Sequence, residues 1–396
     1  MTHAQPSGPP RRPGFRVPIL VTLLVVAAVA AGALGAYWLT GGTLSRAGTG
    51  TGPGAGSGPG SSPAPAGTQG PRNCAPSAIL VNPCRPWFGA AASGNPGAPE
   101  SKVAQFDYLE RLTGHRLDIF RDYHSPPGSN QLGDLPLNSD EKQLARRPGT
   151  YIDVNWKPAA TFAQAGGGDP AVNRDIDAAA ASIKAIAPRK IFLTIWWEPQ
   201  NDVTSDPGGN CYLNPAATGG TPAQYIAMWR NVENRFRAAG VTNVVWAMDY
   251  QAPPTGMYDC LVPRLWPGNG LVDWVIYDTY SRNRYATWAN TVGRFYHVLE
   301  SDSSPSVDFD AKPWGLGEFG TCANFSTPAA NDFYLQARDA VQANTYPRLK
   351  MYLAYADTGG PKAGPGCLSN YNSFGQPDAA KQANFNQFAG AVLARR

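Results

Sequence analysis

The chain has 396 residues and a formal net charge of +4. Five arginines within the first 73 residues carry that excess, and without them 28 basic residues face 29 acidic ones. The remainder therefore has no basic surface of the kind that nucleic acid requires, and we expect no nucleic-acid partner. It is long enough for one large core, such as an eight-stranded α/β barrel, or for two smaller cores.

The first predicted element is a membrane helix. Residues 17–39 contain no charged side chain, and about 20 apolar residues span a bilayer. Three arginines precede this run and none follows before Arg46, which predicts a cytoplasmic N-terminus at 1–16 and a transmembrane signal-anchor at 17–39. The alternative is a cleaved signal peptide, because Ala31-Gly32-Ala33 resembles a cleavage site. Either way, we expect the rest of the chain to be extracytoplasmic, anchored to the cell membrane or secreted.

Residues 40–73 follow as a linker rich in Gly, Ser, Thr, Pro and Ala, which cannot bury enough apolar surface to fold. We interpret this segment as a tether for a single domain at 74–396. All six cysteines lie in that domain, and an even number in an oxidising compartment predicts three disulfides. From proximity in the predicted topology we expect the pairs Cys74–Cys84, Cys211–Cys260 and Cys322–Cys367.

Short apolar segments alternate with helical patterns along the whole domain. The predicted strands are 86–91, 117–122, 151–156, 190–197, 243–248, 272–278, 313–319 and 350–356. The predicted helices are 101–113, 137–146, 173–187, 222–239, 287–300, 328–343 and 378–394, with only a short turn near 258–265. Eight strands in this alternation favour a (β/α)₈ barrel. The alternative is a doubly wound open sheet, which lacks its usual support because no G-x-G-x-x-G loop follows a strand.

Two glutamates are predicted at the carboxyl ends of strands. Glu198 ends the fourth strand directly before Pro199, which should hold it extended. Glu318 ends the seventh strand within "KPWGLGEFGT", where Gly315, Gly317 and Gly320 leave room for a close approach. In such barrels the carboxyl ends of the strands form the active face.

Two glutamates across one cleft suit the cleavage of a glycosidic bond. One carboxyl must donate a proton to the leaving oxygen, and the other must be ionised to attack or stabilise the anomeric carbon. The competing interpretation of each glutamate is a structural ion pair or a solvated strand end. The four histidines form no ligand-spaced cluster and no C-x-x-C occurs, so we predict no metal and no cofactor.

Three stretches resemble clan A glycoside hydrolases, most of all family 26, the β-mannanase family: 225–249, 271–281 and 312–321. The resemblance implies a (β/α)₈ hydrolase with Glu198 as acid/base and Glu318 as nucleophile. Tyr280 matches the tyrosine that hydrogen-bonds the nucleophile, and Arg121 sits where the clan often places an arginine near that carboxylate.

The chain departs from the family pattern in three places. Trp197 precedes the acid/base where the clan has Asn or His, Trp156-Lys157 stands where mannanases tend to have Trp-His, and Tyr355 replaces a common sugar-platform Trp. We expect Trp156, Lys157, Trp197 and Tyr355 to bind substrate, with Trp156 and Trp197 as stacking platforms. Trp196 is expected in the core. Asp249 and Asp278 are strand-end acids that either cap loops or contact substrate.

The prediction is therefore an endo-acting, retaining glycoside hydrolase for a β-linked polysaccharide, mannanase-like and monomeric. One alternative is a barrel that binds a glycan without cutting it. Another is a clan A enzyme acting on a different cell-wall or surface glycan.

Overall fold

The computed structural model describes residues 74–93, 101–126, 135–281, 286–321, 328–357 and 379–394. All of them belong to the second of two compact units, Thr68–Arg396. The predicted segments 1–16, 17–39 and 40–73 and the predicted Cys322–Cys367 bond lie outside the described residues. Among the helices within these ranges, none combines the length and the apolar character that crossing a membrane requires.

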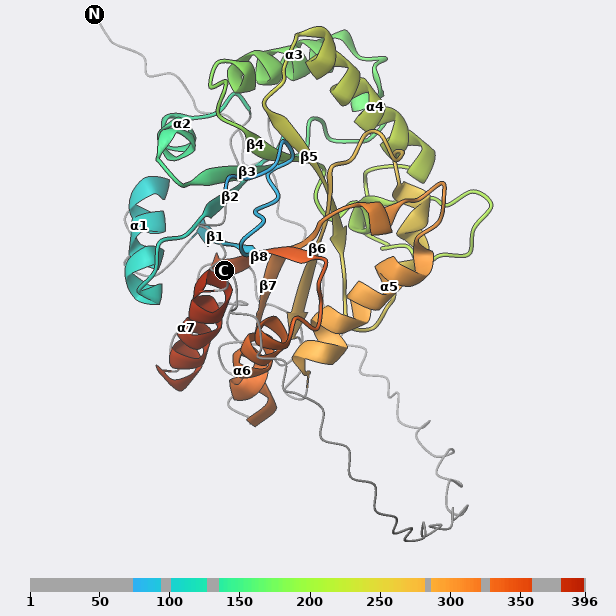
Figure 1. The fold of residues 1–396 in the computed structure, drawn as a ribbon. Coiled ribbons are helices and arrows are strands. Elements are labelled where there is room, and N and C mark those ends of the chain that lie inside the picture. Colours follow the sequence, from blue (N-terminus) through green and yellow to red (C-terminus); the bar gives the residue numbers. More distant parts are fainter. Residues whose placement is uncertain are drawn as a thin grey trace, which may run out of the picture. The chain divides into compact units, whose positions relative to one another are not determined.

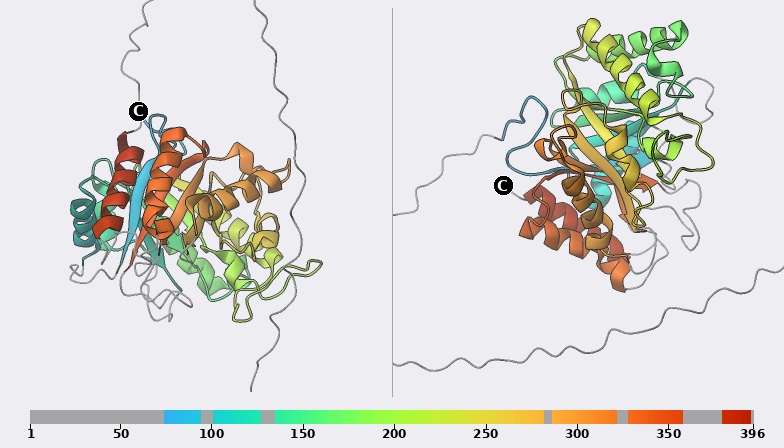
Figure 2. Two further views of the ribbon diagram at one scale, coloured as in Figure 1. Left: turned by 90° about the horizontal axis from the view of Figure 1, so that it is seen from below. Right: turned by 90° about the vertical axis from the view of Figure 1, so that its right-hand side faces the viewer.

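Eight parallel strands close into a barrel, with β1 paired to both β2 and β8. The strands are β1 (Trp87–Ser93), β2 (Ile119–His124), β3 (Tyr151–Trp156), β4 (Ile191–Ile195), β5 (Val244–Gln251), β6 (Trp274–Ser281), β7 (Trp314–Thr321) and β8 (Leu349–Asp357). The helices are α1 (Lys102–Thr113), α2 (Ser139–Arg146), α3 (Pro170–Lys184), α4 (Pro222–Ala238), α5 (Arg294–Asp302), α6 (Pro328–Ala343) and α7 (Ala379–Ala394). Figure 1 shows the helices arranged around the outside of the strands, and Figure 2 shows the same arrangement from two other directions. The closed sheet excludes the doubly wound alternative.

Every predicted strand and helix forms, with shifts of a few residues at the ends. The connection after β5 contains only the short 3₁₀ turns Asp259–Leu261 and Pro263–Leu265, which confirms the weak link expected there. The fifth helix begins late, because a π-helical turn at Ala289–Gly293 precedes it. Strand β4 ends at Ile195, two residues before the predicted end, whereas β5 and β6 each continue three residues beyond theirs.

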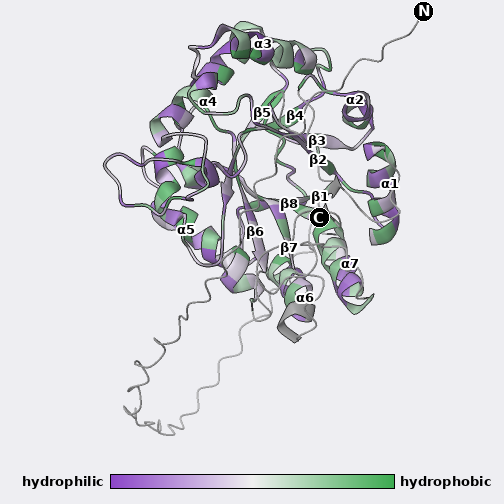
Figure 3. Ribbon diagram, turned by 180° about the vertical axis from the view of Figure 1, so that it is seen from behind, coloured by the Kyte–Doolittle hydropathy of each residue, from purple (hydrophilic) through white to green (hydrophobic). Residues whose placement is uncertain are grey.

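Helix α4 illustrates how local sequence sets an element. Thr221 caps its N-terminus by accepting a hydrogen bond from the backbone N–H of Gln224, and the side-chain oxygen of Gln224 accepts one from the backbone N–H of Thr221. Pro222 occupies the first turn. One apolar stripe of the helix is buried against the core: Tyr225, Trp229, Val232 and Phe236. Figure 3 shows that α4 carries both hydrophobic and hydrophilic residues, as expected for a helix with one buried face.

A separate small core closes the amino-terminal end of the barrel. Its larger members are Leu80, Trp87, Phe192, Trp274 and Leu353. The indole nitrogen of Trp87 donates to the carbonyl of Leu80 and that of Trp274 to the carbonyl of Ile79, each at 2.6 Å. The segment before β1 therefore plugs this end. The predicted Cys74–Cys84 disulfide is formed within that segment.

The second predicted disulfide, Cys211–Cys260, is also formed. It joins the long connection after β4 to the short turns after β5, both of which leave the carboxyl ends of their strands. Two neighbouring loops at the active face are thus covalently linked, and the first of them begins with the segment that carries Glu198.

Candidate active site

A β-bulge in β7 directs Glu318 into the barrel. Tyr277 of β6 pairs with Leu316 and the next residue, Asp278, pairs with Glu318, so Gly317 is left over. A Cβ atom on Gly317 would lie 2.5 Å from the Arg121 guanidinium and 2.6 Å from the Asp278 carboxylate. The sequence predicts open space beside this glycine. In the structure, the side chains of Arg121 and Asp278 fill that space.

Two tyrosines hold the Glu318 carboxylate, one on each oxygen. Tyr123 of β2 donates to Oε1 at 2.5 Å, and Tyr280 of β6 donates to Oε2. Burial is the main cause that raises the pKa of both phenols well above their ordinary value, and the Glu318 charge adds to it. Both phenols thus keep their protons and act as donors. Glu318 itself is 8% exposed.

Arg121 lies beneath Glu318 and binds several acids at once. Its guanidinium contacts Asp153 at 3.0 Å, Asp249 at 2.6 Å, Asp278 at 3.3 Å and Glu318 at 3.5 Å. It is thus near the Glu318 carboxylate, as the resemblance implies. The side chain is 0% exposed, so it offers no surface to a sugar and acts only through its protein partners.

One guanidinium cannot balance several carboxylates in a dry interior, so burial favours the protonated form of the three aspartates. Burial raises the pKa of Asp278 well above its ordinary range, with Asp249 and Glu318 adding repulsion. Burial also raises the pKa of Asp249 to about 6 and raises that of Asp153, and Arg121 opposes the rise in both. Asp249 and Asp278 therefore contact Arg121 in the barrel interior and do not cap loops.

Glu198 adopts a conformation that differs from the predicted one. Its φ and ψ are both 49°, in the left-handed region, and Trp196 has a φ of 61°. The expectation of an extended Glu198 before Pro199 is therefore wrong. Because β4 ends at Ile195, the chain reverses within three residues, and two left-handed residues make that reversal at a cost of about 1–2 kcal/mol each.

The loop after β4 holds this strained turn through its own polar groups. Asn201 donates its side-chain amide to Glu198 Oε2 at 2.9 Å and its backbone N–H to the Glu198 carbonyl at 3.0 Å. The buried Gln200 side chain binds the backbone of Gln251 in both directions, which ties the loop to β5. Gln200 is therefore a structural bridge between the loop and β5.

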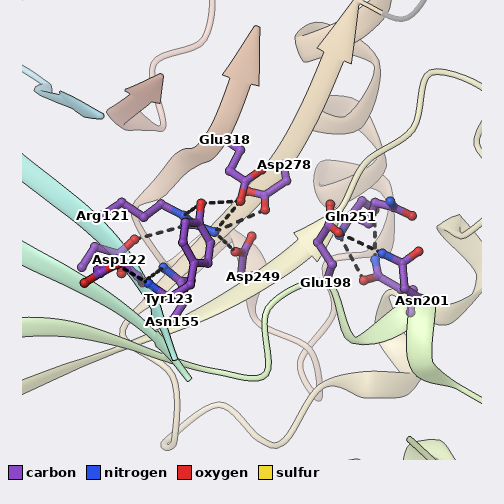
Figure 4. A network of polar contacts seen from close by, with 12 residues as sticks. Arg121, Asp122, Tyr123, Asn155, Glu198, Asn201, Asp249, Gln251, Asp278 and Glu318 are labelled. Atoms are coloured by element: carbon purple, nitrogen blue, oxygen red, sulfur yellow. Dashed lines mark hydrogen bonds and ion pairs between the residues drawn. The ribbon is translucent and has the colours of Figure 1, made fainter. Parts of the chain in front are cut away.

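The two glutamates face one interior from different supports. Figure 4 shows Glu318 on its strand beside Asp278, and Glu198 on the loop after β4 beside Asn201 and Gln251. Both glutamates raise the pKa of Asp278 through their charge, so both lie within electrostatic range of it. Asp278 is thus a buried carboxyl group whose pKa is raised by both predicted catalytic residues.

Three of the predicted aromatic residues surround Glu318 together with Tyr123. The Trp197 ring packs edge-on against Tyr123 with 5.4 Å between centroids. The Tyr355 ring lies 6.5 Å from Tyr123 and 6.2 Å from Tyr280. Trp197 and Tyr355 are partly exposed, so each has a surface available to a ligand.

Lys157 joins the ends of β3 and β4. Its ammonium lies 4.6 Å from the centroid of Trp197 and 2.8 Å from the Asp202 carboxylate. The same Asp202 oxygen accepts the indole N–H of Trp196 at 2.7 Å. Lys157 thus fixes the position of the Trp197 ring, and its own head group is partly exposed.

The remaining predicted platform, Trp156, lies apart from this group. Its ring is 3% exposed and packs 6.4 Å from Phe236 of α4, in the layer between strands and helices. A buried ring has no face for stacking on a sugar, so this placement does not favour the predicted role. Trp196 is 2% exposed in the same core, which confirms the expectation for that residue.

A second polar cluster lies on the outer side of β2. Asp122, His124 and Glu141 are buried, and their potential ligand atoms lie within 4.8 Å of one another. His124 bonds Glu141 at 2.5 Å, Glu141 caps α2, and the ammonium of Lys102 bonds Asp122. These contacts join the four side chains in one ion-pair network.

Tyr123 and Asp153 are site residues that the sequence interpretation missed. Alternation supplies the signal, because Arg121 and Tyr123 are two residues apart on one strand and share its inner face. Asp153 and Asn155 likewise interrupt an otherwise apolar strand at every second position.

Comparisons with known proteins found one curated relative and several solved structures with a similar fold. No family model matches the chain. Endoglucanase H of Acetivibrio thermocellus is 24% identical over 257 residues, which is 62% of this chain and 25% of that protein. The chain thus spans about a quarter of the length of this curated relative.

Solved structures of family 26 share the barrel. A Bacillus subtilis mannanase superposes with a TM-score of 0.50 at 12% identity, covering 77% of this chain and 86% of the mannanase. The GH26 domain of an endo-β-mannanase/endo-β-glucanase from Prevotella bryantii gives a TM-score of 0.49 at 16% identity, covering 76% and 92%. The superposition on the mannanase thus shows a shared fold.

Proposed function

We propose that this protein is a retaining glycoside hydrolase that cleaves a β-linked polysaccharide internally, with a mannan-like glycan as the first candidate substrate. The observation that carries the proposal is the way the Glu318 carboxylate is held. Each of its oxygens accepts a hydrogen bond from a tyrosine hydroxyl, and a buried arginine lies beneath it. A carboxylate held in this way has a fixed direction of approach to a reacting carbon.

The roles of the two glutamates follow from their supports. Glu318, on a strand and bound by protonated phenols, attacks the anomeric carbon and forms a glycosyl-enzyme. Glu198, partly exposed on the loop after β4, donates a proton to the leaving oxygen and then removes one from the incoming water. The raised pKa of Asp278 favours its neutral form, which adds no charge that would repel either carboxylate.

The aromatic side chains favour a sugar polymer as the ligand. The Trp197 and Tyr355 rings are partly exposed next to the tyrosines that hold Glu318, and rings of this kind pack against apolar sugar faces. The similar proteins named above are a mannanase, a mannanase/glucanase and an endoglucanase. We therefore rank mannan and β-glucan first and other cell-wall or surface glycans second.

The proposed setting is extracytoplasmic, with a monomeric domain tethered through residues 17–39 or secreted after their removal. Two disulfides within the described residues support an oxidising compartment. A tethered hydrolase would act on glycans near the cell surface.

The test is a hydrolysis screen of the purified protein against mannan, xylan, β-glucans and bacterial wall polymers, with oligosaccharide products separated by chromatography. Glu318→Gln and Glu198→Gln serve as matched isosteric variants, and each should lower turnover at least about 10³-fold while binding is kept. Wild-type binding without cleavage would instead support a glycan-binding barrel. Equal cleavage by wild type and Glu318→Gln would refute the assignment of the nucleophile.

A further inference from the structure

We propose that Tyr123 is a second positioning residue for Glu318, and that it acts mainly in the breakdown of the glycosyl-enzyme. This inference rests on the proposed function and deepens it. Tyr123 comes from β2, on the opposite side of the carboxylate from the β6 tyrosine that the family resemblance points to. It stabilises one defined oxygen, Oε1, and leaves Oε2 to bond the anomeric carbon.

The direction of each hydrogen bond is fixed by Arg121. Its Nε–H can only donate, and it lies 2.9 Å from the Tyr123 hydroxyl oxygen. The phenol oxygen is therefore an acceptor toward Arg121, and its own proton points to Glu318 Oε1 at 2.5 Å. The chain Arg121–Tyr123–Glu318 is thus polarised in one direction, which strengthens the last bond.

The two oxygens of Glu318 are unequal. Oε1 faces the Tyr123 proton and also lies 3.5 Å from the Arg121 guanidinium, whereas Oε2 is bonded by Tyr280. The positive charge is thus on the Oε1 side, beneath the carboxylate. Oε1 is therefore the oxygen that remains bound to the protein throughout the reaction, as a carboxylate oxygen before attack and as the ester carbonyl afterwards.

This asymmetry affects the two chemical steps differently. In the first step Oε2 forms a bond to the anomeric carbon, the glycosidic bond breaks, and the leaving oxygen takes the proton of Glu198. In the second step water adds to the anomeric carbon, its proton goes to Glu198, and the bond to Oε2 breaks with its electron pair returning to Glu318. A donor on Oε1 stabilises the departing carboxylate, so its loss slows the second step most.

The support around Tyr123 is specific. Its ring packs against Trp197 and Tyr355, and the Arg121 guanidinium lies 5.3 Å from its centroid. Tyr123→Phe keeps these ring contacts and removes only the hydroxyl. Tyr250→Phe is a matched control, because the Tyr250 hydroxyl is buried on β5 and donates to the Val262 carbonyl at 3.0 Å, outside this chain of bonds.

The experiment compares wild type, Tyr123→Phe and Tyr250→Phe with a dinitrophenyl β-glycoside of the sugar found in the substrate screen. For Tyr123→Phe we expect kcat to fall about 10- to 100-fold, on the scale of one hydrogen bond to a charged group. KM should fall with it, because the glycosyl-enzyme accumulates, and rapid mixing should show a burst of dinitrophenol. Mass spectrometry of the quenched reaction should find the sugar on Glu318. The Tyr250→Phe kinetics should match wild type.

Other outcomes overturn the inference in recognisable ways. A fall in kcat/KM for Tyr123→Phe with KM unchanged and no burst would make Tyr123 a contributor to the first step or to the fold. Equal effects of Tyr123→Phe and Tyr250→Phe would reduce it to general stability. If wild type cleaves the glycan and Glu318→Gln does not, while Tyr123→Phe is fully active, the inference alone fails. An inactive wild type would remove the proposed function as well.

Discussion

The two halves of the candidate site are built in different ways. Glu318 comes from a strand, is 8% exposed, and is held by side chains of β2 and β6. Glu198 comes from a strained turn, is partly exposed, and is bound by Asn201, three residues away along the chain. Contacts between distant segments thus fix one carboxylate, and mainly local contacts hold the other.

This difference fits two chemical duties. A nucleophile must meet one carbon along one line, so a rigid support helps it. An acid that becomes a base must reach first a leaving oxygen and then a water, and it needs contact with solvent between the steps. The comparison indicates that damage to the Glu318 half should affect stability and chemistry together, whereas damage to the Glu198 half should affect chemistry alone.

The largest effect should come from Glu198→Ala, and it should depend on the leaving group. Hydrolysis of the natural glycan should fall about 10³- to 10⁴-fold, because its leaving oxygen needs a proton. A dinitrophenyl glycoside needs none, so its first step should be nearly unchanged. Added azide should then restore turnover and give a β-glycosyl azide, whereas Glu318→Ala with azide should give the α-anomer. The configuration is read by NMR, and the reverse pattern would exchange the two roles.

Gly317→Ala should break the Glu318 half through sterics. The new methyl would lie 2.5 Å from Arg121 and 2.6 Å from Asp278, so we expect a loss of about 1–3 kcal/mol in unfolding free energy together with a large loss of activity. Gly270→Ala is the control, because a Cβ there meets nothing within 4 Å. Urea denaturation of both variants measures the difference. If Gly317→Ala has the stability and activity of wild type, the side chains around this position can move to accommodate a methyl group.

Asp249→Asn should sharpen the electrostatic side of the comparison. Burial raises the folded-state pKa of Asp249 to about 6 from an ordinary 3.8, so its proton stabilises the folded state below pH 4. That contribution is lost as pH rises through about 6. Wild type should therefore lose about 2–3 kcal/mol more stability between pH 4 and pH 7 than Asp249→Asn does.

Denaturation curves at several pH values test this expectation, with the exposed Asp339→Asn as a control. Some slope should persist in Asp249→Asn, because burial also raises the pKa of Asp122 to about 6. If stability depends on pH in the same way for wild type and Asp249→Asn, the raised pKa of Asp249 in the folded state would be contradicted.

The smallest effect should come from Asn201→Ala. It removes a single hydrogen bond to Glu198 Oε2 on the partly exposed loop, so activity on the natural glycan should fall roughly 3- to 10-fold. Thermal stability should stay within a degree or two of wild type. A loss of stability as large as that of Gly317→Ala would remove the distinction between the two halves.

The strands and helices could be predicted because each depends on its own residues. Alternation of apolar and helical patterns was sufficient for the closed barrel, and Pro222 and Thr221 mark the start of α4 directly. The end of β4 was missed because Trp196 and Trp197 are as apolar as the strand before them. Apolar character alone cannot distinguish a strand from a packed turn.

The candidate site was only partly predictable for a physical reason. Both glutamates follow from their strand ends, but the partners of Glu318 come from far along the chain, with Tyr123 195 residues away. The bond between Arg121 and Asp249 spans 128 residues. Such pairings depend on how the closed barrel aligns its strands, and no local pattern encodes them. The left-handed Glu198 likewise depends on Asn201 and on the packing of Trp196.

The plug at the amino-terminal end of the barrel has a consequence for orientation. The polypeptide enters the domain at Cys74 on the underside, where Leu80 and Trp87 seal the strands. The glutamates lie at the carboxyl ends of the strands, so the sealed end and the candidate opening are at opposite ends of one barrel. A long, insoluble fibre could therefore reach the glutamates without displacing the plug.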